Sequence, residues 1–150
     1  VQLDPAAPNW GHITNTPKPG WADCDIAGHV SRALGVPAGF DTDVNAAALA
    51  EHRLGSGQGA TSLAYVTVGT GVGGGLVLGD ALVHGAAHPE IGHLLPRRPA
   101  GDGDFPGICP HHGDCLEGLV CGPAIIARWG QPLSALPADV DARRDLACRY

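Results

Sequence analysis

Methionine is absent from this 150-residue chain, lysine occurs once, and Lys, Arg, Asp and Glu together make up only 16% of the residues. Nine Lys and Arg residues stand against fifteen Asp and Glu residues, so the net charge is −6. Nucleic acids and anionic membrane surfaces bind proteins through a basic face, which this composition does not supply. The longest apolar stretch, residues 62–78, is interrupted by Gly and Thr. We therefore expect neither nucleic acid nor a membrane as a partner.

The two ends of the chain lack the signals of a complete protein. The beginning, Val1-Gln-Leu-Asp-Pro, has no Met and no basic-then-apolar pattern of a signal peptide. The last residues, 145–150, resemble a helix without a stop signal. We therefore expect a piece of a longer protein, with part of any active site outside it.

The five cysteines, at positions 24, 109, 115, 121 and 148, are odd in number and lack the spacing of a disulfide framework. Cys24, Cys121 and Cys148 fall outside the pattern described next and are expected to pack as small apolar groups. Such usage is typical of a reducing compartment, so we expect a cytoplasmic protein.

The segment Cys109-Pro-His-His-Gly-Asp-Cys115 is the most informative one, because its cysteines and histidines have the spacing of metal ligands. One of its histidines, together with His93 upstream, completes a set of two thiolates and two imidazoles. Such a set suits a closed tetrahedral site for a structural zinc ion. Spacing alone barely separates His111 from His112 as the fourth ligand. The alternative is a loop of free thiols without a metal.

Periodicity and turn residues predict a mixed α/β chain. Helices are expected at residues 22–34, 44–54, 115–121, 122–129 and 138–150, and strands at 36–40, 62–68, 76–78 and 81–84. A glycine-rich turn, 69–75, precedes the third strand, and residues 85–108 look irregular. Residues 55–59, Gly-Ser-Gly-Gln-Gly, predict a flexible break and a domain boundary.

Five segments in their order resemble the ROK family of sugar kinases, and within it the bacterial fructokinases. They are Thr16-Pro-Lys-Pro-Gly-Trp21, Gly39–Leu49, Thr67–Gly75, His88-Pro-Glu-Ile-Gly-His93, and Cys109–Gly118 with Gly122-Pro-Ala-Ile125. The resemblance implies an α/β chain with the actin-like, ribonuclease H-like fold, whose two domains hold ATP and a sugar between them. It implies that residues 1–56 end the first domain and residues 57–150 begin the second, with an inserted zinc loop, 88–117. The fold would be incomplete at both ends, and the piece alone inactive.

Asp43 inherits the role of catalytic base from this resemblance. In Asp43-Val-Asn45-Ala-Ala it matches the family's Asp-x-Asn-Ala-Ala motif. A sugar kinase needs a base to orient and deprotonate the attacking hydroxyl. From the residues alone, the alternative is that Asp43 caps the helix that follows. Asp41 is a separate candidate, either for the cap itself or for a minor partner of the base.

Thr42 and Asn45 are candidate substrate-binding residues beside Asp43. Asn45 could bind sugar or cap the helix, and we expect it to have a supporting role. The family's sugar kinases often have Asn where this chain has Thr42, which leaves a sugar contact of Thr42 open.

The glycine-rich turn contains Gly-x-Gly-x-x-Gly at positions 69, 71 and 74, a weak dinucleotide signal on its own. A strand is predicted after it, whereas a dinucleotide site requires a helix. Under the resemblance, backbone amides of the turn and the Thr70 hydroxyl approach the phosphates of ATP. The implied cofactor-binding residues are Gly69, Thr70, Gly71, Gly73 and Gly74. The alternative is an ordinary hairpin turn.

The resemblance implies that Glu90, His93 and Glu117 bind the sugar, since carboxylates accept hydrogen bonds from neighbouring hydroxyls. The alternative for each glutamate is a solvated surface acid. The family pattern Cys-Pro-x-His-x-x-Cys selects His112, so the implied zinc ligands are His93, Cys109, His112 and Cys115. His93 would bind the metal through one ring nitrogen and could reach the sugar with the other.

Together these residues imply a hexose kinase that uses ATP and Mg²⁺, most simply one that converts fructose to fructose 6-phosphate. The resemblance also suggests a homodimer of full-length chains. A second hypothesis is the sugar-sensing domain of a ROK-type transcriptional regulator without kinase activity. A zinc hydrolase is a third, and the closed ligand set argues against it. His84 and His88 receive no role.

Overall fold

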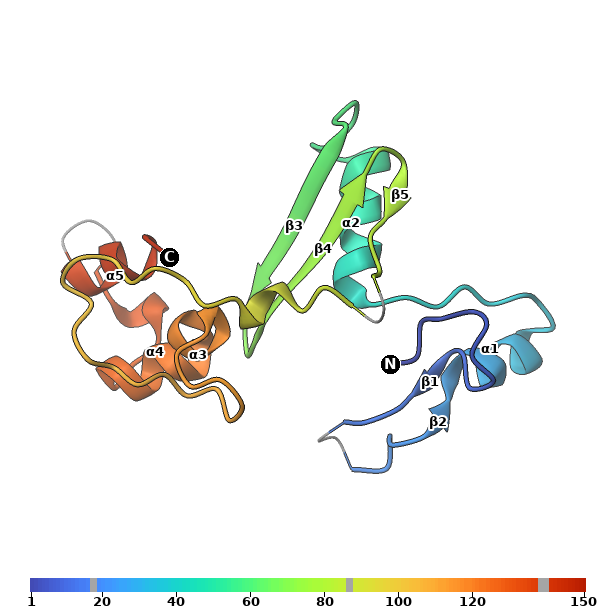
Figure 1. Ribbon diagram of the computed structural model, residues 1–150, viewed down its shortest axis with the longest axis horizontal. Helices are drawn as coiled ribbons and strands as arrows, with labels where there is room; N and C mark the ends of the chain where they lie inside the picture. Colours follow the sequence, from blue (N-terminus) through green and yellow to red (C-terminus); the bar gives the residue numbers. More distant parts are fainter. Residues whose placement is uncertain (17–18, 86–87, 138–140) are drawn as a thin grey trace. The chain divides into compact units, whose positions relative to one another are not determined.

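The computed structural model describes residues 1–16, 19–85, 88–137 and 141–150 (Figure 1). Its helices and strands confirm the expected mixed α/β class. The chain divides into two compact units: residues 1–65 with 75–89, and residues 66–74 with 90–150. In the described part of the chain, no helix has both the length and the apolar character to span a bilayer. The predicted boundary at residue 56 concerns the domains of the whole protein and stays a prediction.

The first unit begins with a short two-stranded ribbon and a helix. β1 (His12–Ile13) pairs antiparallel with β2 (Cys24–Asp25), and α1 (Ile26–Leu34) follows directly. The Asp25 side chain caps α1 by accepting a hydrogen bond from the Gly28 N–H at 2.9 Å. This pairing and this cap explain why α1 begins at Ile26 and not at residue 22, as the periodicity predicted.

The strand predicted at residues 36–40 is wrong, because this described segment is irregular. Pro37 has no N–H to contribute to a strand ladder. The Val36 carbonyl accepts a hydrogen bond from the Ser31 hydroxyl at 2.6 Å instead of one from a neighbouring strand. A short apolar run therefore forms a connection here between α1 and the next helix.

Helix α2 (Asp43–Leu54) lies against the middle strand of a three-stranded sheet with the order β3–β4–β5 (Figure 1). The strands are β3 (Ser62–Val68), β4 (Val72–Leu78) and β5 (Ala81–Leu82). A Cβ at Gly75 would overlap the Val44 carbonyl, so only glycine allows the helix backbone and the strand to come this close. The helix and β3 occur where the sequence predicted them, and β5 is shorter than predicted.

Strand β4 begins at Val72, four residues earlier than predicted. Gly73, Gly74 and Gly75 therefore belong to the strand, and the turn is confined to residues 69–71. The glycines were predicted to form a turn, because glycine often interrupts regular structure. Gly75 shows that glycine is also required within a strand where another element packs closely against it.

The second unit consists mainly of loops and short helices. Its apolar core joins Val72, Cys121 and Ala124, with Phe105, Leu116 and Val120 packed around them. The helical segments are η1 (Ile91–His93), α3 (Leu116–Val120), α4 (Gly122–Trp129), η2 (Leu133–Ala135) and α5 (Ala142–Ala147). Both α3 and α4 were predicted, and α5 is shorter than its predicted range. Residues 138–140 of that range, and residues 17–18 of the first resembling segment, lie outside the described residues.

Substituting Gly75→Ala is expected to destabilise the first unit, because the added methyl group would overlap the Val44 carbonyl. Overpacking of this kind costs about 1–3 kcal/mol, which urea unfolding of the full-length protein would detect. Gly39→Ala is the matched control, since nothing lies within 4 Å of a Cβ added there. An unfolding midpoint for Gly75→Ala equal to that of Gly39→Ala would refute the close contact of helix and strand.

Candidate functional site

Four side chains of the second unit converge on one point: His93, Cys109, His112 and Cys115, with ligand atoms all within 4.8 Å of one another. The Cys109 Sγ lies 3.8 Å from His93 Nδ1 and 3.7 Å from His112 Nδ1. The Cys115 Sγ lies 3.5 Å from His93 Nδ1. Tetrahedral zinc, with bonds of about 2.3 Å to sulfur and about 2.0 Å to nitrogen, separates a sulfur from a nitrogen ligand by about 3.5 Å. The donor set and its spacing therefore fit a four-coordinate metal.

The backbone around Cys109 supports this arrangement. Cys109 and Gly113 exchange two backbone hydrogen bonds, of 3.1 and 2.9 Å, and the resulting tight turn brings His112 back beside the Cys109 sulfur. Burial raises the pKa of Cys109, but the backbone N–H groups of His111 and His112 outweigh it, so the net shift is downward. Backbone donors directed at the sulfur favour the thiolate form that a metal requires.

The same turn packs directly on α3 and on η1. A Cβ at Gly118 would overlap the Gly113 carbonyl, so the helix touches the turn without an intervening side chain. Ile108 donates its N–H to the Gly118 carbonyl at 3.0 Å, and Leu116 donates to the Leu94 carbonyl at 2.8 Å. The metal candidates are thus built into the contact between η1, the turn and α3.

Glu117 of α3 is directed at the glycine-rich turn and is not a solvated surface acid. Its Oε2 accepts a hydrogen bond from the Val72 N–H at 3.0 Å. A Cβ at Gly71 would lie 2.7 Å from the same oxygen, so the glycine leaves room for the Glu117 carboxylate. Gly122, at the start of α4, donates to the Gly69 carbonyl at 2.7 Å. Two helices therefore contact this turn.

Glu90, directly before η1, is exposed and has a left-handed backbone with φ 49°. Such a conformation is strained for a residue with a Cβ, and strain of this kind concentrates at functional positions. Gly92 secures the segment, because a Cβ there would overlap the Val72 carbonyl. Val72 thus contacts both the segment after Glu90 and the carboxylate of Glu117.

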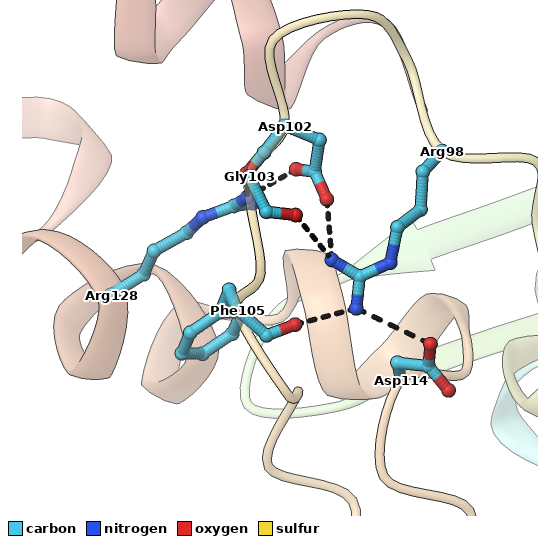
Figure 2. A network of polar contacts seen from close by, with 6 residues as sticks. All are labelled: Arg98, Asp102, Gly103, Phe105, Asp114 and Arg128. Carbon is cyan, nitrogen blue, oxygen red and sulfur yellow. Dashed lines mark hydrogen bonds and ion pairs between the residues drawn. The ribbon is translucent and has the colours of Figure 1, made fainter.

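A buried ion-pair network holds the loop between η1 and Cys109 (Figure 2). The Asp102 side chain is only 2% exposed and pairs with Arg128 of α4 and, at 2.6 Å, with Arg98. Arg98 reaches further acceptors: the carbonyls of Gly103 at 3.2 Å and Phe105 at 2.5 Å, and the Asp114 carboxylate at 3.2 Å. Because Asp114 adjoins Cys115, the network joins the loop to the metal segment.

The charge of Asp102 is maintained by the side chains around it. Burial alone would raise its pKa, but the Tyr150 side chain, the hydrogen bonds from Arg128 and Arg98, and the charge of Arg128 hold the pKa below its ordinary value. Sequence reasoning did not identify this network. Its only local signal is the spacing of Arg98 and Asp102, four residues apart in a segment without periodicity.

In the first unit, Thr42 and not Asp43 caps helix α2. The Thr42 hydroxyl oxygen accepts a hydrogen bond from the Asn45 N–H at 3.2 Å, and Asp43 is the first helical residue. Within the described residues, the Asp43 carboxylate accepts one hydrogen bond, from the Val44 N–H at 2.9 Å. The alternative that Asp43 caps this helix is therefore wrong.

Asp41, two residues earlier, is surrounded by donors. Its Oδ1 accepts hydrogen bonds from the Thr42 N–H at 2.8 Å and from Asn45 Nδ2 at 2.7 Å. Its Oδ2 lies 2.6 Å from His84 Nε2. Burial raises the pKa of Asp41, but these hydrogen bonds lower it more, so the net shift is downward. Asn45 is fully buried in this arrangement.

The predicted site residues fall into two groups. Thr42, Asp43 and Asn45 belong to the first unit, together with residues 75–78 of β4, whereas residues 72–74 of this strand belong to the second unit. The second unit contains the four metal candidates, Glu90, Glu117 and the turn 69–71. Gly73 and Gly74, predicted as turn residues, lie in β4, and Gly74 is buried.

Residues 5–144 match the model of the ROK family, and the chain therefore belongs to that family. This confirms the resemblance carried by the five sequence segments. The segments that resemble the family include both the start of α2, where Asp43 lies, and the Cys/His cluster.

Bacterial fructokinases are among the most similar curated relatives. The chain is 48% identical to a fructokinase of Zymomonas mobilis over 149 residues, which are 99% of this chain and 50% of that protein. It is 41% identical to a fructokinase of Pediococcus pentosaceus over 139 residues, or 93% of this chain and 48% of the relative. The chain thus spans about half the length of the curated relatives it matches.

Solved structures confirm the ROK sugar-kinase fold, which is actin-like. A ROK hexokinase from Thermus thermophilus superposes with a TM-score of 0.65 at 36% identity, covering 89% of this chain and 43% of that one. A ROK glucokinase from Streptomyces griseus, solved with glucose and AMPPNP, gives a TM-score of 0.57 at 30% identity over 77% of this chain and 36% of its own.

Substituting Asp102→Asn is expected to lower the free energy of unfolding by about 3 kcal/mol, because it leaves the buried Arg128 without its charge partner. The pKa of folded Asp102 is depressed, so its contribution is present at neutral pH and is lost as the pH falls through that lowered pKa. Urea unfolding of the full-length protein at about pH 7 and about pH 3 should therefore show a difference from wild type that shrinks in acid.

Asp145→Asn provides the matched control for Asp102→Asn. Asp145 also pairs with an arginine four residues away, but its side chain is 62% exposed, and surface pairs contribute about 0–1 kcal/mol. If the two variants were equally stable at neutral pH, the buried network would have no special energetic role.

Proposed function

We propose that the whole protein is a hexose kinase that transfers the γ-phosphoryl group of ATP to fructose and forms fructose 6-phosphate. The observation that carries this proposal is 48% identity to a fructokinase across 99% of the chain. The start of α2 supports it, because Asp43 at this position offers a carboxylate suited to act as a base.

Asp43 is proposed to accept the proton of the sugar 6-hydroxyl. As the proton leaves, the hydroxyl oxygen bonds to the γ-phosphorus and the bond from that phosphorus to the ADP oxygen breaks. A carboxylate with one local hydrogen bond retains lone pairs for a hydroxyl. Asp41 is a poorer candidate for the base, because three donors already surround it.

ATP is proposed to contact the turn 69–71 through exposed backbone and the Thr70 hydroxyl. Gly73 and Gly74 lie in strand β4, which follows this turn. The proposed ATP contact is therefore limited to residues 69–71, fewer than the sequence predicted. Mg²⁺ bound with ATP would neutralise charge on the transferring phosphoryl group. The Streptomyces griseus glucokinase, whose structure contains AMPPNP, supports ATP as the donor.

Glu90, His93 and Glu117 are proposed to bind sugar hydroxyls. Zinc held by His93, Cys109, His112 and Cys115 would have a structural role, because all four positions of a tetrahedral ion are occupied. By joining η1 to the start of α3, these ligands would set the places of Glu90 and Glu117. A cytoplasmic homodimer completes the proposal, supported by five free cysteines and by the family resemblance.

The base assignment predicts that Asp43→Asn lowers kcat of the full-length enzyme by about 10²–10⁴-fold, the usual contribution of a general base. Fructose binding should change little, because the amide keeps the size of the side chain. A coupled assay for ADP measures turnover, and calorimetry measures fructose binding. A kcat close to that of wild type would exclude Asp43 as the base. The same assay with glucose, mannose and N-acetylmannosamine tests the choice of sugar.

The zinc assignment predicts that His112→Ala loses bound metal and His111→Ala retains it. The reason is geometric: His112 Nδ1 lies 3.7 Å from the Cys109 sulfur and belongs to the convergent set. Elemental analysis of purified full-length protein measures zinc, and the thiolate bands of cobalt-substituted protein report the ligands. The opposite result, with zinc lost from His111→Ala alone, would exchange the two assignments.

A further inference from the structure

Two histidines that follow β5 reach back to the turn before α2. His84 Nε2 lies 2.6 Å from Asp41 Oδ2, across 43 residues of sequence. His88 Nε2 lies 3.3 Å from the Thr42 hydroxyl oxygen, across 46 residues. Both contacts lie within the first unit, and neither histidine has a role in the proposed chemistry. They connect to the two residues that directly precede Asp43.

These contacts determine how the turn is held. The Asp41 carboxylate links His84 to the Thr42 N–H and to the buried Asn45 side chain, which lies two residues beyond Asp43. One carboxylate therefore binds the backbone just before Asp43 and a side chain just after it. Hydrogen bonds to a charged group are about twice as strong as neutral ones, which makes Asp41 an effective junction.

Asp43, in contrast, has among the described residues only a local hydrogen bond to the next residue of its own helix. The direction of its carboxylate depends on the backbone of residues 41–45. A displacement of about 1 Å at a reacting group can cost about 10²-fold in rate. If Asp43 is the base, the contacts that hold residues 41–45 in place therefore affect the reaction rate directly.

We propose that the contacts His84–Asp41 and His88–Thr42 form a clamp that positions the Asp43 base, with Asp41 and His84 as its main positioning residues. This inference rests on the proposed function of Asp43. The clamp acts by holding residues 41–45 against the segment after β5, without touching the sugar or ATP.

The test uses the full-length enzyme and separates kcat from KM. His84→Ala and Asp41→Asn should each lower kcat by about 10- to 100-fold, with the KM for fructose changed by less than about threefold. The double variant should be no slower than the slower single variant, because both changes remove one contact. His84→Gln should recover much of kcat, since its amide can donate to Asp41.

Asp80→Asn is the matched control. Asp80 Oδ1 lies 3.3 Å from His52 Nε2, so it forms a His–Asp pair in the same unit but at the turn between β4 and β5. Its loss should leave kcat unchanged. Comparing thermal midpoints of all variants, with kcat normalised to folded protein, separates positioning from general stability.

The outcomes distinguish the clamp from the base. Wild-type kcat in His84→Ala and Asp41→Asn, with Asp43→Asn inactive, would overturn the clamp and leave the base assignment intact. Additive losses in the double variant, or equal losses in Asp80→Asn, would also overturn it. Undiminished turnover in Asp43→Asn would instead refute the assignment of Asp43 as the base, on which the clamp depends.

Discussion

The convergence of His93, Cys109, His112 and Cys115 is the constraint on which the second unit depends. From Leu94 to Cys115, all within the described residues, regular structure is limited to the Cys109–Gly113 bridge. The apolar core formed around Val72, Cys121 and Ala124 is small, and a small core alone stabilises a fold weakly. A metal bound by the four residues would link segments that secondary structure does not join, so metal binding and folding of this unit would be coupled.

The Arg98–Asp102–Arg128 network constrains the same loop by different physics. It requires no metal, and it reaches both Phe105 and Asp114, which flank the metal segment. Buried charges lose much of their attraction to desolvation, so such a network is a weak source of net stability. Its partners are nevertheless directional, and a loop with other conformations would leave buried charges unpaired. We therefore infer that the network selects one loop conformation, which presents the two cysteines at a fixed separation.

Local signals in the sequence predicted α2, β3, α3 and α4, because their periodicity and end residues lie within a few positions of one another. The Cys/His cluster was equally accessible, since three of its members fall within seven residues. Contacts between polar residues that are distant in the sequence could not be predicted in this way. Nothing near Arg128 indicates Asp102, 26 residues away, and nothing near His84 indicates Asp41. The early start of β4 was missed for a related reason: the demand for Gly75 comes from Val44 in another element.

Asp41 and Asp43 show how one uncharged residue can separate the tasks of two carboxylates. A helix start attracts a carboxylate as its cap, and either neighbour of Thr42 could have taken that place. Because the Thr42 hydroxyl accepts the Asn45 N–H, Asp41 is left to bind His84 and Asn45, and Asp43 has a single local hydrogen bond within the part of the chain that the structure describes. Thr and Asn both serve as caps, so the departure from the family's usual Asn at this position preserves the cap. The helix start therefore accounts for the hydroxyl at Thr42, and a sugar contact of this residue stays a prediction.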